Sequence, residues 1–319
     1  MPPLPTLSTP TLTLTDPAPG PAFTSLVVTA DRVAAASFSR VCIWSRDGGL
    51  PIATHEIPLS EGTATLFPTL DAVVTRKRGG SKVSGDFDSV ATWSLLGTVQ
   101  EIGSDDFPGT VFRIDVAPDG QHLAVAGRVK YGPQRGYVWR CRRDVTKHAR
   151  FPAFAGPSVE SMWERLVAET RAPLAPLNGM AMNADVLLFA GGGTLRQLDL
   201  PDLRERWSAP MRGVDSAVAL GPENQVVAAN TQTKLIACDA QGAPLWTAKT
   251  QPAAVTRLLW SPKGDVIVTD RLTVHSALDG SPRLHLASES STVAVSPDGR
   301  VVATAPYGTP GIVHLWDVL

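Results

Sequence analysis

Residues 293–319 read VAVSPDGRVVATAPYGTPGIVHLWDVL and form the clearest repeat unit of the chain. A hydrophobic run leads into Ser-Pro-Asp-Gly, a second run leads into a Gly-containing turn, and a third run ends in Trp316-Asp317. Short hydrophobic runs bounded by turn residues are typical of β-strands joined by tight connections. Three such strands cannot bury their apolar faces alone, so this stretch predicts a unit that stacks on copies of itself.

Looser copies of this unit precede it along the chain, and their spacing indicates what each one builds. Pro222 and Pro262 are 40 residues apart, and Pro262 and Pro297 are 35 apart. These distances are close to the length of a four-stranded propeller blade, about 40 residues. Pro118 and Pro222 are 104 residues apart. Two blades would leave about 24 residues over, which predicts an insertion between the third and fourth of seven copies.

The two ends of the chain predict how the copies close into a ring. The last copy stops at its third strand, residues 312–318, while residues 11–15 near the other terminus read Thr-Leu-Thr-Leu-Thr, an alternating β-type pattern. A strand from the N-terminus that completes the last blade would remove an exposed sheet edge. We therefore expect an all-β, seven-bladed β-propeller. Residues 1–21 would be a Pro-rich segment with the closing strand, and residues 22–319 a single propeller domain.

The chain resembles the WD-repeat β-propellers, most clearly at residues 296–299 with Trp316-Asp317 and at residues 117–120 with Val138-Trp139. The Gly-His dipeptide of many members of that family is absent. The fifth copy, with residues 236–242 and Leu245-Trp246, also resembles the repeats of quinoprotein-like propellers. Both resemblances imply the same architecture. Because the shared motifs are structural, they carry over no functional residue.

The expected insertion contains one stretch with helical period, residues 158–170. Its apolar residues follow the i, i+3, i+4, i+7, i+8 pattern of one helix face. Ser158 is a suitable N-cap, and Pro173 would end the helix. We expect a short helical insertion at about 148–175, between blades three and four. Its apolar face would either pack on the propeller or bind a partner, and it consists of Val159, Met162, Trp163, Leu166 and Val167.

Two connections between second and third strands are expanded and basic, namely residues 76–82 and 128–135. Residues 76–150 contain 13 Lys or Arg against 8 Asp or Glu, in a chain whose net charge is −1. In the resembling family these connections share one face with the blade-to-blade connections, so the basic loops and the helix would form one recognition face. Solvated surface loops are the alternative reading. The candidate loop residues are Arg76, Lys77, Arg78, Lys82, Arg128, Lys130, Tyr131 and Arg135.

Motifs that would indicate an enzyme are weak. The six histidines have no metal-ligand spacing, and no Gly-x-Ser-x-Gly is present. His275 and His314 each follow a Val in a third strand, which suggests equivalent repeat positions. The glycines at 191–193 lack a following Lys and read as a hairpin turn. We expect no cofactor and no metal. A lactonase-like hydrolase with its site in the central channel stays an alternative, because sequence spacing does not test that arrangement.

Composition limits the partners. A net charge of −1 gives no global attraction to nucleic acid, and the basic loops lack the interleaved aromatic residues that stack on bases. Phosphate or nucleic-acid binding through the two basic loops therefore remains a minor alternative. Cys42, Cys141 and Cys238 have no paired spacing, so we expect free thiols in a reducing compartment.

The sequence also lacks a signal peptide and any run of about 18 apolar residues. These features together favour a cytoplasmic, non-catalytic protein-binding scaffold or adaptor. It would use one face of the propeller and act as a component of a multi-protein complex.

Overall fold

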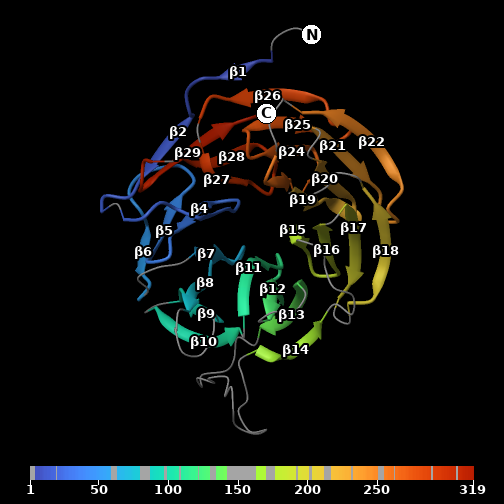
Figure 1. Ribbon diagram of the computed structural model, residues 1–319. Helices are drawn as coiled ribbons and strands as arrows, with labels where there is room; N and C mark the ends of the chain where they lie inside the picture. The colour runs from blue at the N-terminus through green and yellow to red at the C-terminus, as the bar shows by residue number, and fades with distance from the viewer. Residues whose placement is uncertain are drawn as a thin grey trace, which may run out of the picture.

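The described strands form seven sheets arranged in a ring, as Figure 1 shows. The structure is a computed structural model. It describes residues 4–18, 20–58, 63–79, 87–96, 99–107, 109–120, 122–129, 134–141, 163–169, 177–191, 193–200, 203–211, 217–230, 233–250, 255–261, 263–288, 290–306 and 308–319. Six sheets have four strands and one has five. The predicted all-β, seven-bladed propeller is confirmed, and its similarity to WD-repeat propellers is taken up below.

Each blade is a meander of strands that runs from the centre of the ring outward. Blade one is β3 (Ser25–Val28), β4 (Arg32–Ala36), β5 (Arg40–Ser45) and β6 (Ala53–Glu56). Blade two is β7 (Thr63–Leu66), β8 (Ala72–Gly79), β9 (Phe87–Ser94) and β10 (Gln100–Phe107). Blade three is β11 (Gly109–Val116), β12 (His122–Val129), β13 (Gln134–Cys141) and β14 (Trp163–Glu169). Blade four is β15 (Leu177–Met182), β16 (Val186–Gly191), β17 (Thr194–Asp199) and β18 (Glu205–Pro210).

The remaining three blades follow the same order. Blade five is β19 (Ala217–Leu220), β20 (Val226–Asn230), β21 (Lys234–Cys238) and β22 (Pro244–Lys249), with a short 3-10 turn, Pro222–Asn224, between its first two strands. Blade six is β23 (Leu258–Trp260), β24 (Val266–Thr269), β25 (Thr273–Ser276) and β26 (Pro282–Leu286). Blade seven contains β27 (Ser290–Val295), β28 (Val301–Pro306) and β29 (Ile312–Asp317).

We call the strands of each blade A to D from the centre outward, which defines two ends of the ring. At the CD end, strand A turns into strand B and strand C turns into strand D. At the BC end, strand B turns into strand C and one blade passes to the next. Because neighbouring strands in a blade are antiparallel, all connections of one kind lie at the same end.

The hydrophobic core is divided into wedges between neighbouring blades. Strands B are buried along nearly their whole length, as in β24 and β28, while the outer strands β18 and β22 alternate between exposed and half-buried residues. Seven hydrophobic clusters result, and each one joins a blade to the next around the ring. Each blade therefore depends on both neighbours for its burial, as the repeat pattern predicts.

The N-terminal strand closes the ring as predicted. Strand β2 (Leu12–Thr15) pairs antiparallel with β29 and is strand D of blade seven. Leu14 is fully buried in the wedge between blades seven and one. A second contact is new: β1 (Thr6–Leu7) pairs in parallel with β26 and adds a fifth strand to blade six. The N-terminal segment thus spans two blades on the circumference of the propeller (Figure 1).

Asp16, directly after β2, fixes the same segment to blade one. Its buried carboxylate lies 3.3 Å from Arg40 Nε and accepts a hydrogen bond of 3.3 Å from Cys42 Sγ. Burial and the nearby Asp16 raise the pKa of the Cys42 thiol to about 12. Cys42 and Cys238 are both free and buried, as the sequence predicts. Three consecutive blades are therefore held by the first residues of the chain.

The predicted helix is wrong for residues 163–169, which form β14. This strand pairs antiparallel with β13, with Cys141 opposite Trp163 and Tyr137 opposite Glu169. Trp163, Leu166 and Val167 are thus on a strand, while Val159 and Met162 lie outside the described residues. The open edge of β13 offers a row of backbone hydrogen bonds, and pairing with it outweighs a local helical period.

This correction moves the insertion within the fold. Residues 142–162 join strands C and D of blade three, whereas the insertion expected at about 148–175 was placed between blades three and four. The chain therefore leaves β13 and enters β14 at the CD end, the end opposite the two basic connections.

In the part of the chain that the structure describes, no helix is long and apolar enough to cross a membrane.

Tryptophan fills the wedges between blades in two different ways. Three tryptophans of strand C are buried, namely Trp44, Trp93 and Trp316. The indole Nε1 of Trp93 donates to Thr75 Oγ1 at 2.8 Å, and that of Trp316 donates to Thr304 Oγ1 at 3.0 Å; both threonines are in strand B. In strand D, Trp207 and Trp246 instead donate to a backbone oxygen in the CD connection of the next blade, at 2.9 and 3.0 Å. The chain thus combines two kinds of tryptophan contact between its blades.

His275 has a different position from the one expected. It pairs with Ile267, as Trp316 pairs with Val302. Val266 follows Ser261 of its AB turn by five residues, and Val301 follows Ser296 by the same number, so Ile267 and Val302 are equivalent positions. His275 therefore takes the position of Trp316 and is not equivalent to His314. Its ring is buried, Nδ1 lies 3.0 Å from Gly280 O, and burial lowers its pKa.

Candidate functional site

The predicted basic loops are in part extended strands at the BC end of blades two and three. Strands β8, β9, β12 and β13 have eight residues each, whereas strands B and C of the other blades have four to six. Arg76, Lys77 and Arg78 are on β8, Arg128 is on β12, and Arg135 is on β13. Lys82, Lys130 and Tyr131 lie outside the described residues.

Arg76 already has partners within the propeller. Its Nη1 donates to Val111 O at 2.5 Å, and its Nε lies 3.9 Å from a carboxylate oxygen of Asp88. The same buried carboxylate accepts a hydrogen bond of 2.7 Å from Val111 N. Arg76 and Asp88 therefore join blade two to the inner strand of blade three, which gives this arginine a structural role beside any contact with a partner.

The inner strands carry one group of charged residues near the axis of the ring. Asp115 on β11 is half-buried and accepts a hydrogen bond of 3.0 Å from Val116 N. Burial raises the pKa of its carboxyl to about 6, against the opposing effect of Arg113. Arg257, directly before β23, donates to Thr292 Oγ1 on β27 at 2.7 Å. This group contains one carboxylate and two guanidinium groups, whereas calcium sites need several oxygen ligands.

The other side chains that commonly bind metals are not grouped either, among the described residues. Within the described ranges, no group of three or more His, Cys, Asp or Glu side chains is placed so that it could hold a metal ion.

Among the described residues, the large apolar side chains that are most exposed lie at the CD end. They belong to five consecutive blades, from five through seven to one and two; five of them lie in or beside a connection between strands C and D, and Leu319 follows strand C of blade seven. The residues are Leu50, Ile52, Leu96, Leu245, Leu278 and Leu319, with exposed fractions from 50% to 86%. Single exposed leucines are ordinary, but a set confined to one end of a molecule indicates an interaction surface.

These residues were missed in the sequence although a signal for three of them exists. In each of three blades a leucine follows the strand C tryptophan position by three residues. Leu96 follows Trp93, Leu278 follows His275, and Leu319 follows Trp316. A large aliphatic residue recurring at one repeat position in a polar turn has no role in the wedge cores, so the recurrence itself points to the surface.

The same end carries an excess of exposed carboxylates. Among the described residues of the AB and CD connections, seven acidic side chains are exposed, against three basic ones. The acidic residues are Asp31, Asp47, Asp119, Asp185, Glu223, Asp265 and Asp279, and the basic ones are Arg204, Lys263 and Arg300. Among the described residues, the connections at this end therefore carry more exposed acidic than basic side chains.

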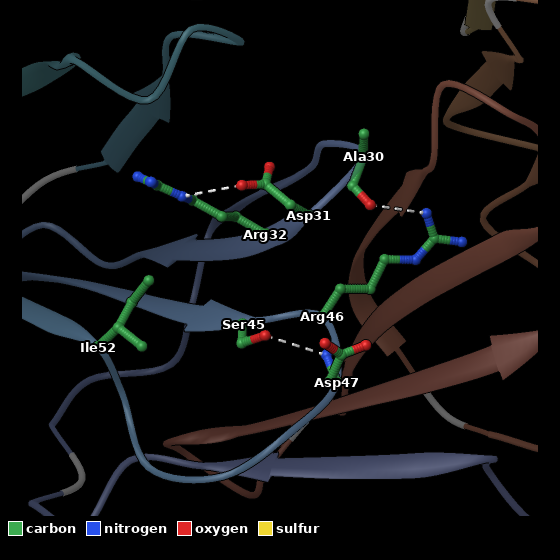
Figure 2. Close-up of a pocket in the computed structure, with 7 residues that line it drawn as sticks. All are labelled: Ala30, Asp31, Arg32, Ser45, Arg46, Asp47 and Ile52. Atoms are coloured by element: carbon green, nitrogen blue, oxygen red, sulfur yellow. Dashed lines mark hydrogen bonds and ion pairs between the residues drawn. The ribbon is translucent and has the colours of Figure 1, made fainter.

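A cavity of about 600 Å³ opens at the CD end of blade one. Figure 2 shows its lining residues, Ala30, Asp31, Arg32, Ser45, Arg46, Asp47 and Ile52, which come from the AB and CD connections and the adjoining strand ends. Arg46 donates to Ala30 O at 3.3 Å and lies 3.3 Å from a carboxylate oxygen of Asp298 in blade seven. The cavity therefore lies beside the junction of the first and last blades.

The charges around the cavity are unevenly paired. A hydrogen bond from Ser296, followed by contacts with Arg300 N and Arg46, lowers the pKa of Asp298 to about 2. Asp31 accepts a hydrogen bond of 3.0 Å from Thr29 and lies 3.4 Å from Arg32. Asp47 is exposed, and among the described residues no basic side chain forms an ion pair with it. The cavity is thus lined by the Asp47 carboxylate, which has no ion pair among the described residues, and by the exposed side chain of Ile52, with Ser45 between them (Figure 2).

Comparisons with known proteins give the fold a family resemblance. No protein-family model matches the sequence, and no curated protein does. Among solved structures, a chain of the mitotic checkpoint complex matches with a TM-score of 0.66 and 15% identity, over 98% of this chain and 92% of that one. U3-55K matches at 0.63 and 12%, over 96% and 98%. The WD40 repeats of RRP9 match at 0.63 and 12%, over 98% and 99%. At these identities the likeness shows the fold alone, a seven-bladed β-propeller similar to those of WD-repeat proteins.

Proposed function

We propose that this chain is a non-catalytic scaffold that binds protein partners at an end of its propeller, as a component of a multi-protein complex. The observation that supports this most is the match, over nearly the whole chain, to a propeller that was solved as part of a protein complex. The wedge cores hold the connections of seven blades on a rigid ring, and loops on a rigid frame are where binding residues concentrate.

The basic hairpins of blades two and three remain one candidate surface. Lys77, Arg78, Arg128 and Arg135 lie on strands that extend further than those of the other blades. Basic residues on paired strands suit an acidic segment of a partner, because residues on a strand lose less conformational entropy on binding than residues of a flexible loop. Arg76 contributes less, since its guanidinium already contacts Asp88 and Val111.

A reducing compartment, and within it the cytoplasm, is part of the same proposal. Two of the three cysteines are free and buried, and burial raises the pKa of Cys238 to about 11, so both thiols behave as small apolar groups.

The test is the size and composition of the native assembly. Extract of the native host is separated by size exclusion, and the tagged full chain is captured from the same extract. We expect the endogenous chain to elute well above its 33.8 kDa and the capture to recover discrete partners at comparable amounts. Elution as a monomer, with no partner enriched over an unrelated propeller used as control, would contradict the proposal.

A further inference from the structure

The chemistry of the CD end differs from that of the basic hairpins in two ways. It has exposed aliphatic side chains in five consecutive blades, and exposed carboxylates outnumber exposed basic side chains in its described connections. Aliphatic side chains gain most from contact with other apolar groups, while the carboxylates repel phosphates and anionic lipid headgroups. A surface with both properties suits a protein segment whose apolar residues alternate with lysine or arginine.

The cavity in blade one shows where such a segment would anchor. Asp47 faces it with an unpaired carboxylate, and Ile52, whose side chain is 57% exposed, lines the same space. Leu50, 74% exposed, lies between them in the sequence. Arg46 is held by Asp298 and Ala30 O, so it is not available to cancel the charge of Asp47. A basic side chain of a partner can therefore pair with Asp47 while a neighbouring apolar residue contacts Ile52.

We propose that the CD end of the propeller docks a basic and apolar peptide segment of a partner protein, anchored at Asp47, Leu50 and Ile52 and continued over the exposed leucines of the neighbouring blades. This inference rests on the proposed scaffold function and assigns the end and the chemistry of the partner. The charge excess and the exposed leucines select one occupant: an acidic peptide would be repelled by the same carboxylates that attract a basic one.

The probe for this surface is a library of random twelve-residue peptides displayed on phage and selected on the immobilised full chain. We expect enrichment of sequences that combine Lys or Arg with Leu, Ile or Phe. Binding of a selected peptide should weaken by about tenfold or more in the variant Asp47→Lys with Ile52→Ser, because the charge is reversed and the apolar contact is lost. It should also weaken with added salt.

A matched control changes charge at the other end. The variant Lys77→Glu with Arg78→Glu reverses two charges on the BC hairpin and should leave binding of the peptide unchanged. Both variants alter strand ends or turns outside the wedge cores, and circular dichroism with thermal melting confirms that each one folds.

Three results would overturn the inference. The first is enrichment of acidic or purely apolar peptides, and the second is binding that is lost only in the BC variant. The third is self-association of the wild-type chain that the Asp47 variant abolishes, since the surface would then bind a second copy. Each of these can occur while the native assembly is still recovered from the host, so failure of this inference is separable from failure of the scaffold function.

Discussion

Tryptophan and glycine form a repeated contact between neighbouring blades at the CD end. In blades four and five the strand D tryptophans, Trp207 and Trp246, lie against Gly242 and Gly280 of the following blade. Both glycines have a positive φ, which side chains rarely adopt, and the indole ring occupies the place where a Cβ would lie. The ring contact depends on the next blade, so the sequence of a single repeat does not reveal it.

The variant Gly280→Ala tests this contact. At φ +70° an added Cβ would meet the Trp246 ring at 2.5 Å and Ala248 Cβ at 2.6 Å, so we expect a loss of about 3 kcal/mol in the free energy of unfolding. Gly308→Ala is the matched control, because Gly308 has φ +80° and nothing within 4 Å; it should cost only about 1 kcal/mol. Urea unfolding measures both. Equal losses would show that the ring contact contributes nothing.

Asp115 predicts a pH dependence of stability. Its pKa is raised from the ordinary 3.8 to about 6, so the folded chain binds a proton more tightly than the unfolded chain. The free energy of unfolding should therefore fall as the pH rises through the window from about 4 to 6, by at most about 3 kcal/mol for this group. Asp115→Asn removes the titrating group, so the variant should lose less stability than the wild type across this window. Urea midpoints at pH 4 and pH 7 test the difference, and parallel losses in both chains would contradict it.

Local sequence did not reveal the roles of single charged residues. Arg76 reads as one of several exposed arginines, yet its contacts with Asp88 and Val111 lie in strands more than ten residues away. The register that places His275 at a tryptophan position is also invisible without the pairing of β24 and β25. Such assignments depend on long-range contacts, which a periodic pattern does not encode.

At the scale of elements, the N-terminal segment decides the stability of the ring. Strand β2 was predictable because a missing fourth strand and an orphan alternating segment are both visible in the sequence. Strand β1 was not, since two residues between prolines carry no pattern. Strand β14 was misread because its apolar residues fit a helical period, and only the free edge of β13 decides between the two structures.

Two truncations separate the contributions of the N-terminal strands. Removing residues 1–20 deletes β2, with buried Leu14 and Asp16, and exposes the edge of β29. Loss of a buried leucine alone costs about 2–5 kcal/mol, so we expect Tm to fall by roughly 10 °C or more. Removing residues 1–8 deletes only β1, which has two paired residues, and should lower Tm by a few degrees. Calorimetry measures both, and a 1–20 truncation that melts like the full chain would disprove the closure.

At the scale of the whole molecule, the repeat pattern was sufficient for the number of blades, their order and the closure of the ring. It was not sufficient for the surface. The exposed leucines at 96 and 278 are far apart in the sequence, and they share one end because every connection between strands C and D lies there; Leu319 follows strand C of blade seven at the same end. Basic residues stand out in a sequence when they cluster along it, whereas the seven exposed acidic residues of the described AB and CD connections are spread over five blades.

Docking of a partner at the CD end can be tested by hydrogen–deuterium exchange of the full chain, alone and bound to the partner captured from the native host. Docking there should slow exchange in the connections at residues 46–52, 95–96 and 277–281 and leave residues 76–79 and 87–90 unchanged. Protection confined to those BC hairpin residues, with the CD connections unaffected, would contradict it.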